Sequence, residues 1–294
     1  MSLHLVPHPV HPVNPARRLV IVHTTAYRYD RPVVASYNEA RMTPLTTPVQ
    51  TALEARIDVD VMTWSMTYAD YWGTQVTAFE ALLPHQTMNV VSTSLVELYP
   101  SDTPAAAAGW DVLHRADVRD TQHEYLQQTP CTTPMAEVTA LARDVAADLP
   151  PDAAARAVVA HLRGLLEYAP GSTSVHTDAL EVWRTRRGVC QDFAHLALGA
   201  LRSLGIPARY VSGYLHPRPD AALGETVEGQ GHAWVEWWAG DWVPYDSTHL
   251  ADVGVDHVLV ARGRDYTDVT PLKGIIAGAT SSELAVTVEV TRVV

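Results

Sequence analysis

The chain has 294 residues, of which 47% are hydrophobic, and this suffices for the packed core of one large domain or of two ordinary ones. Its formal net charge is −12 and its only arginine cluster is Arg184, Arg186 and Arg187, so neither nucleic acid nor a membrane is an expected partner. No apolar run approaches the roughly 18 to 20 residues that cross a bilayer, and the N-terminus lacks the pattern of a signal peptide, so a cytoplasmic protein is expected.

The first third of the chain has the pattern of a β-rich region. Residues 1–17 contain prolines and histidines without apolar periodicity, which predicts a disordered tail. Between residues 18 and 100 apolar and polar residues alternate, with Ile57, Val59 and Val61 on one face of a predicted strand. Turn-forming residues separate five such stretches, which predicts an antiparallel β sandwich or a curled sheet. The expected strands are 19–29, 36–45, 52–70, 74–84 and 87–99.

The rest of the chain is expected to contain a linker, a core with helices, and a final strand. The stretch that begins at Ser101 is small, polar and proline-containing, which is typical of a boundary. Apolar residues three and four apart predict helices over about 134–145 and 152–166, and Asp178 with Glu181 predicts the start of a third, short helix. These parts are a linker at 101–130, a core at 131–262, and a C-terminal loop and strand at 263–294.

A single cysteine stands at the start of the most apolar predicted helix. Apolar residues recur at helical spacing between Arg187 and Leu204, which predicts a buried helix with Cys190 in its first turn. The free N–H groups and the dipole of a helix start favour an anion, so a lowered thiol pKa is expected and Cys190 is a candidate nucleophile. A buried structural cysteine is the common alternative. Cys190 and Cys131 are both expected to be free thiols.

His232 and Asp246 follow on two consecutive predicted strands and favour the nucleophile. A thiol, an imidazole and a carboxylate are the nucleophile, the base and the orienting group of thiol catalysis. A three-residue loop between the strands pairs Trp238 with Trp242 and makes His232 a diagonal neighbour of Asp246 on one face. A two-residue loop would place Asp246 on the opposite face. The three-residue loop is therefore predicted.

The stretches GVCQDFAHLALGALRSLGIPARYVSGYL, HAWVEWW and WVPYDST resemble the transglutaminase-like superfamily of papain-fold thiol enzymes. The segments IVHTTAYRYDRPV and GRDYTDVTPLKG resemble its bacterial members that carry a β-rich N-terminal region. The resemblance implies an α+β fold in which the helix carrying the cysteine packs on an antiparallel sheet. It also implies catalytic roles for Cys190, His232 and Asp246. One departure is local, because Ser247, Thr248 and His249 stand where the family usually has Pro, Thr and Asn.

Several other residues have weaker claims to a role. Trp234 shares the predicted His232 face and is a candidate wall of a substrate groove, although aromatic residues on a hairpin are more often core. In relatives the loop that holds Tyr168 and His176 lies near the nucleophile, so both are candidate substrate contacts. His195 lies about 140° around the helix from Cys190 and is expected to pack. The long acidic connection 216–231 is expected to be a lid or a solvated insertion.

The expected function is acyl transfer from a peptide or side-chain amide through Cys190, most simply as a cysteine protease or amidase. A transglutaminase that uses an amine acceptor is one alternative, and a catalytically silent peptide-binding module is another. The cysteines and histidines show no zinc-type spacing, and the chain lacks phosphate-binding, nucleotide and calcium-binding motifs, so no cofactor and no metal are expected. The expected partner is a peptide or protein substrate, and the oligomeric state is left open.

Overall fold

The computed structural model describes residues 16–100, 107–218 and 220–294. The predicted tail therefore lies outside the described residues except for its last two positions, and so does the start of the predicted linker. Three short helices occupy much of the rest of the segment expected to be a linker. They are α1 (Trp110–Leu113), α2 (Ala116–Thr121) and α3 (His123–Leu126).

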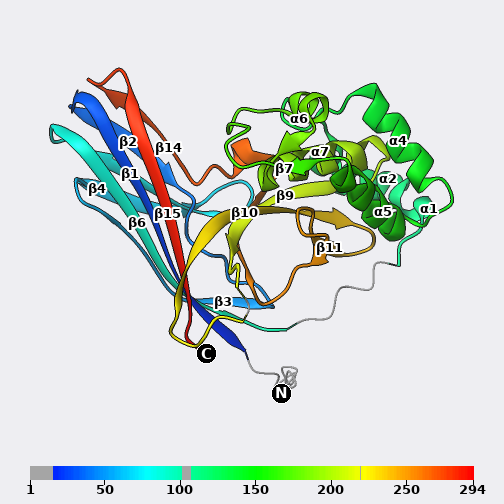
Figure 1. Cartoon of the computed structure of the whole chain (residues 1–294), viewed down its shortest axis with the longest axis horizontal. Helices are drawn as coiled ribbons and strands as arrows, with labels where there is room; N and C mark the ends of the chain where they lie inside the picture. The colour runs from blue at the N-terminus through cyan, green and yellow to red at the C-terminus, as the bar shows by residue number, and fades with distance from the viewer. Residues whose placement is uncertain (1–15, 101–106, 219) are drawn as a thin grey trace, which may run out of the picture.

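A sandwich of two antiparallel sheets forms one end of the molecule (Figure 1). One sheet has the order β3-β6-β1-β15 and the other β14-β2-β5-β4. Apolar side chains of both sheets, such as Tyr29 and Phe79, form a shared core together with Met42 of the loop after β2. The strands are β1 (Arg17–Val33), β2 (Ala35–Ala40), β3 (Gln50–Val59), β4 (Trp64–Ala69), β5 (Gln75–Ala81), β6 (His85–Leu98), β14 (Leu272–Ala277) and β15 (Ser282–Arg292).

The third predicted strand is divided between the two sheets. As predicted, Ile57, Val59 and Val61 share a face, and they pack on the sandwich core. The chain then turns, because the Asp60 carboxylate accepts hydrogen bonds from the backbone N–H and the side-chain amide of Asn89 at 3.1 and 2.6 Å. The single strand expected at 52–70 is therefore two strands, β3 and β4. The sequence alternation continues through the turn and conceals it.

Helix α7 (Cys190–Ser203) is the centre of the other half. Every residue from Asp192 to Arg202 is buried, because α7 packs against helices on one side and against a sheet on the other. Its helical neighbours are α4 (Ala136–Ala146), α5 (Pro151–Gly164) and α6 (Ala179–Thr185), each close to its predicted range. Asp178 caps α6 as predicted, since its carboxylate accepts the Glu181 N–H at 2.8 Å.

The sheet beside α7 is antiparallel and carries the hairpin with His232. Its strands are β9 (Ala208–Leu215), β10 (Thr226–Trp238), β11 (Trp242–Asp246), β12 (Ala251–Asp252) and β13 (His257–Gly263). The hairpin pairs Trp238 with Trp242 and Val235 with Tyr245, which confirms the predicted three-residue loop. Gly240 in this loop has a φ of 100°, which favours glycine.

Strand β10 joins the two halves of the molecule. Its first residues, Thr226–Gly229, pair with β15 of the sandwich, and the residues from Gln230 to Trp237 pair with β9 (Figure 1). The expected loop at 216–231 therefore ends at Glu225. Sequence alone could not show this, since Thr226–Gly231 has only one large apolar residue, Val227, which is buried.

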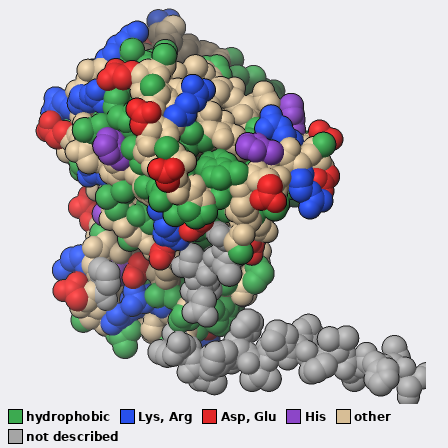
Figure 2. All heavy atoms as spheres, turned by 90° about the vertical axis from the view of Figure 1, so that its right-hand side faces the viewer, with side chains coloured by type: hydrophobic (Ala, Val, Ile, Leu, Met, Phe, Trp, Pro, Cys, Tyr) green, Lys and Arg blue, Asp and Glu red, His purple; other side chains and the backbone are tan. Residues whose placement is uncertain are grey.

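Figure 2 shows acidic and basic side chains interspersed over the face that carries the helices. Among the described residues, every helix is too short or too polar to cross a lipid bilayer. The short strands β7 (Glu167–Tyr168) and β8 (Arg187–Gly188) and the 3-10 turn η1 (Tyr266–Asp268) complete the described structure.

Candidate active site

The start of α7 places Cys190. Val189 is the N-cap residue, and the Asp192 carboxylate accepts the Val189 N–H at 2.8 Å, which closes the first turn. The Thr173 hydroxyl donates to the same carboxylate oxygen at 2.7 Å and ties the loop after β7 to the helix start. Burial raises the pKa of Asp192. The Asp192 carboxylate therefore has a structural role, because it caps the helix and holds the loop beside the thiol.

Cys190 and His232 line the same cavity, which has a volume of about 150 Å³. The backbone N–H of Ala233, the residue after His232, donates to the Cys190 sulfur, so α7 and β10 touch at this point. Strand β9 supplies a second wall of the cavity. The lining residues from β9 are Tyr210, Ser212, Gly213 and Tyr214.

The sandwich also contributes to this cavity, through His23 of β1 and Arg41, the residue that follows β2. The Arg41 side chain is 6% exposed and donates to Glu39 and Asp70 at 3.0 and 3.1 Å. His23 Nδ1 lies 2.9 Å from the Tyr214 hydroxyl. The N-terminal sandwich is therefore part of the site. Sequence reasoning missed both residues, because strand alternation does not tell which strand reaches the cysteine.

The imidazole of His232 is oriented by Asp246. His232 Nε2 lies 2.7 Å from Asp246 Oδ2, so the neutral ring donates from Nε2 and leaves the lone pair on Nδ1. Asp246 is completely buried. Burial alone would raise the pKa of this carboxyl group, but hydrogen bonds from His232, His257 and His249 outweigh burial and hold the pKa well below its usual range. The carboxylate is therefore charged throughout the physiological range.

Two further imidazoles contact Asp246. His249 Nδ1 lies 2.8 Å and His257 Nε2 lies 3.1 Å from Asp246 Oδ2, and the other oxygen accepts the backbone N–H groups of Thr248 and His249. His249 is one of the two residues that depart from the family pattern, the other being Ser247, and it keeps the carboxylate hydrogen-bonded. His257 gave no sequence signal, since it reaches the site only through the pairing of β13 with β9.

The thiol of Cys190 is protonated at rest. Burial raises its pKa to about 11, although hydrogen bonds from the backbone N–H groups of Ala233 and Gln191 act in the opposite direction. The expectation of a lowered thiol pKa is therefore wrong for the resting structure. The helix starts at Cys190 as predicted, but the sulfur is packed between α7 and β10. The free-energy cost of burying a thiolate there is larger than the stabilisation that the N–H groups and the dipole of the helix start provide.

The remaining sequence candidates divide into near and distant residues. Burial, with a smaller contribution from nearby Cys190, raises the pKa of Tyr168, although part of this side chain is exposed. His176 is exposed on the same loop, which Gln191 holds through the Val175 carbonyl at 3.2 Å. Trp234 lies on the His232 face as predicted, with ring centroids 6.1 Å apart, but it is 1% exposed and is not among the residues that line the cavity. The geometry therefore gives no support to a substrate contact there.

His195 packs rather than reaches the cavity. Its Nε2 accepts the backbone N–H of Tyr266 at 3.2 Å and its ring lies against Tyr210. Burial lowers the pKa of His195 to about 4, so the ring stays neutral near pH 7. The helical-wheel argument against this histidine as the base for Cys190 agrees with its position.

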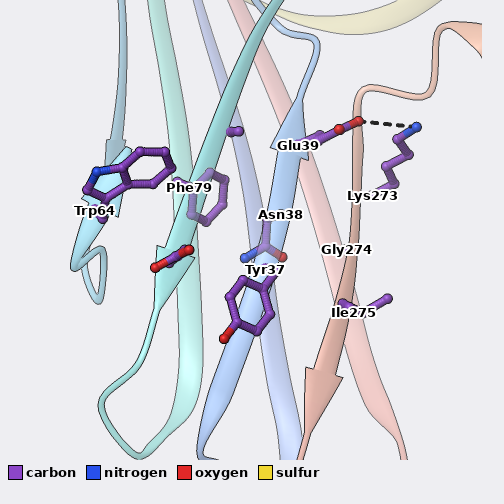
Figure 3. A pocket seen from close by; sticks show the side chains of 10 residues that line it. Tyr37, Asn38, Glu39, Trp64, Phe79, Lys273, Gly274 and Ile275 are labelled. Carbon is purple, nitrogen blue, oxygen red and sulfur yellow. Dashed lines mark ion pairs between the residues drawn. The ribbon is translucent and has the colours of Figure 1, made fainter. Parts of the chain in front are cut away.

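A larger hollow, of about 420 Å³, lies on the β14-β2-β5-β4 sheet of the sandwich (Figure 3). Tyr37, Trp64 and Ile275 are exposed around it, and Lys273 pairs with Glu39 at 3.2 Å. Its described lining residues include no cysteine and no histidine. It therefore lacks the nucleophile and base that the smaller cavity combines.

Comparison with known proteins decides the family. The family model of the transglutaminase-like superfamily matches residues 139–247, which include Cys190, His232 and Asp246, and that of the bacterial transglutaminase-like N-terminal region matches residues 19–97. The chain belongs to the transglutaminase-like superfamily. Its α+β fold, with an N-terminal β region, is the one that the sequence predicted.

Relatives and a solved structure share almost the full length of this superfamily member. An uncharacterized protein of Mycobacterium leprae is 45% identical over 94% of this chain and 99% of its own. An uncharacterized protein of Mycobacterium tuberculosis is 32% identical over 95% of this chain and 94% of its own. A crystal structure of a candidate cysteine protease from Cytophaga hutchinsonii matches with a TM-score of 0.73 and 20% identity, over 95% of this chain and 98% of that one. This last likeness shows that the fold is shared.

Proposed function

We propose that the protein is a thiol hydrolase that cleaves peptide or side-chain amides through Cys190, His232 and Asp246. The observation that carries the proposal is the orientation of His232. Its Nε2 is taken by Asp246, while its ring lies in the cavity that also holds the Cys190 thiol. The base is therefore fixed in the tautomer whose free lone pair can take a thiol proton.

The high pKa of the thiol sets the order of events. Because the resting thiol is protonated, His232 Nδ1 removes the proton as the sulfur attacks the substrate carbonyl. The charged Asp246 stabilises the imidazolium that forms. The imidazolium then gives the proton to the leaving amine, and a thioester remains on Cys190. His232 next activates water, which releases the acid and restores the thiol.

Water is the proposed acceptor because it is present in the largest amount at a cavity open to solvent. Membership in the superfamily and the shared fold of the Cytophaga hutchinsonii candidate cysteine protease support a thiol enzyme. An amine in place of water would give a transglutaminase, by the same thioester. The choice between the two acceptors is an outcome of the experiment.

Intact-mass spectrometry tests the proposal. Wild type, Cys190→Ala and Cys131→Ala are incubated with a peptide library, with and without the primary amine cadaverine. Peptide cleavage, or loss of ammonia without cleavage, that requires Cys190 and persists in Cys131→Ala supports the hydrolase. Peptide products that carry cadaverine would show instead that the protein is a transglutaminase. Peptide binding without any Cys190-dependent change in mass would show instead that the protein is a catalytically silent binding module.

A further inference from the structure

Three histidines surround one oxygen of Asp246. The distances to Asp246 Oδ2 are 2.7 Å from His232 Nε2, 2.8 Å from His249 Nδ1 and 3.1 Å from His257 Nε2. The ligand atoms of His232, Asp246 and His249 all lie within 4.8 Å of one another. Orienting an imidazole requires a single carboxylate contact, so this arrangement contains more metal-binding groups than the thiol chemistry uses.

We propose that His232, Asp246 and His249 form a binding site for a divalent transition-metal ion of the zinc type, and that the bound ion blocks the base of the thiol reaction. Two imidazole nitrogens and one carboxylate oxygen are ligands that zinc prefers, at about 2.0 to 2.2 Å, with a fourth position left for water. The proposed inhibition depends on the proposed hydrolase function, whereas the proposed metal site does not depend on it.

The ligands need little movement to admit an ion. Metal bonds of about 2 Å in tetrahedral geometry place ligand atoms roughly 3.3 Å apart. The contacts of His232 and His249 with Asp246 are therefore about 0.5 Å too short. His249 can supply this movement, because its side chain is 55% exposed at the start of the connection after β11, while those of Asp246 and His232 are buried. The exposed ring also gives an ion access from solvent.

His257 completes the surroundings without having to bind the ion. Its Nδ1 accepts the backbone N–H of Gly254 at 3.3 Å, which leaves the proton on Nε2, where it points to Asp246 Oδ2. A hydrogen bond from such a neighbour orients a ligating carboxylate and raises metal affinity. His257 is therefore a positioning residue for the metal site.

The ion blocks the reaction because it needs the same nitrogen that Asp246 now holds. A metal on His232 Nε2 requires the lone pair of that atom, so the proton of the neutral ring moves to Nδ1. Nδ1 can then no longer accept the proton of the Cys190 thiol. The ring stays neutral, no electron is transferred, and removal of the ion restores the original tautomer. The inhibition is therefore reversible.

Metal titration of the full chain tests the site. Zn²⁺ binding is measured by isothermal titration calorimetry for wild type, His249→Asn, Cys190→Ala and the matched control His161→Asn, which changes an exposed histidine of α5. The side chain of Asn keeps an N–H donor for Asp246 but its amide nitrogen is not a zinc ligand. All four proteins keep the histidines at positions 4, 8 and 11.

We expect His249→Asn to weaken Zn²⁺ binding by about tenfold or more, since even losing a residue that only orients a ligand costs 10- to 100-fold. His161→Asn and Cys190→Ala should bind as wild type does. Co²⁺ in place of Zn²⁺ should give visible absorption bands without a thiolate-to-cobalt charge-transfer band.

Two results would overturn the site. Weaker binding in Cys190→Ala, with a thiolate-to-cobalt band in wild type, would place the ion between the thiol and His232 Nδ1. Equal binding in all four proteins would place it elsewhere, for example on the N-terminal histidines. Inhibition is measured separately, as the Zn²⁺-dependent fall in activity of wild type and His249→Asn, each relative to its own rate with a chelator. Binding without inhibition would refute the block while leaving the site in place.

Discussion

Replacement of Glu236 by Gln should destabilise the fold, because Glu236 joins the three strands that form the wall of the candidate site. It lies on β10 and is 4% exposed. It accepts hydrogen bonds from Arg209 of β9, at 2.6 Å from Nε, and from Arg262 of β13, at 3.0 Å from Nε and 3.1 Å from Nη2. The amide of Gln has a similar size but no charge. The replacement therefore leaves two arginines in a poorly solvated place.

The magnitude follows from how well each arginine can be solvated afterwards. Removing one partner of a buried ion pair costs about 3 to 5 kcal/mol. The Arg262 side chain is 26% exposed and can regain water, whereas that of Arg209 is 14% exposed and lies over the Trp242 ring at 3.8 Å. Only Arg209 is then left as a buried charge without its partner. The expected loss in the free energy of unfolding is therefore at the lower end of that range, about 3 kcal/mol.

Urea denaturation at pH 7 measures this loss, with Glu289→Gln as the control. Glu289 is exposed on β15 in the same sheet, so its replacement should change the free energy of unfolding by less than about 0.5 kcal/mol. The arginines hold the pKa of Glu236 below its ordinary value against burial, which alone would raise it. Its stabilisation is thus present above the unfolded-state pKa of about 4.3 and is lost as pH falls below it.

The difference between wild type and Glu236→Gln should therefore narrow in acid. A loss below about 1 kcal/mol at pH 7, or a loss of equal size at pH 7 and pH 3, would refute the ion-pair reasoning. Replacing all three residues by apolar ones of similar size should restore much of the stability, because no buried charge then remains.

Three further predictions concern the helix, a buried histidine and the thiol. Gly199→Ala in α7 should lower the free energy of unfolding by about 1 to 2 kcal/mol, since the new Cβ would lie 1.9 Å from the Thr132 carbonyl oxygen. The control Gly164→Ala in α5 has no described atom within 4 Å of its Cβ and should be neutral or stabilising by up to about 1 kcal/mol. Equal effects of the two replacements in denaturation experiments would contradict this prediction. Burial lowers the pKa of His23 to about 4, so this residue should cost up to about 3 kcal/mol of stability as pH falls from about 6.5 to 4, and His23→Gln should show a flatter pH dependence of unfolding by that amount. His232→Ala should slow alkylation of Cys190 by iodoacetamide at neutral pH by at least about tenfold, with a rate that rises toward pH 11; a rate equal to that of wild type would exclude His232 as the base.

Local patterns in the sequence predicted those features of the site that are formed by residues close together in the chain. The start of α7 at Cys190 follows from helical periodicity, and the cap at Asp178 from its spacing to Glu181. The register of the β10-β11 hairpin follows from the parity of His232 and Asp246, because only one loop length brings both onto one face. These features are set within about 15 residues of chain.

The features that could not be predicted depend on contacts between distant segments. His23 and Arg41 line the cavity only because β1 and β2 belong to a sandwich that meets β9 and β10. His257 contacts Asp246 through the pairing of β13 with β9. The raised pKa of Cys190 arises from burial between two elements, and a helix-start argument does not contain that burial. The division of the chain into domains remains a prediction.

The pairing of β10 with β15 sets an order of events during synthesis. Residues Thr226–Gly229 of β10 pair with Val288–Thr291 of β15, which follow every residue of the candidate site in the chain. A growing polypeptide on the ribosome can form α7 and the hairpin early, but the strand that carries His232 is anchored to the sandwich only after β15 has emerged. A nascent chain arrested before β15 should therefore hold an incomplete site. Completion of the candidate site therefore waits for the synthesis of β15.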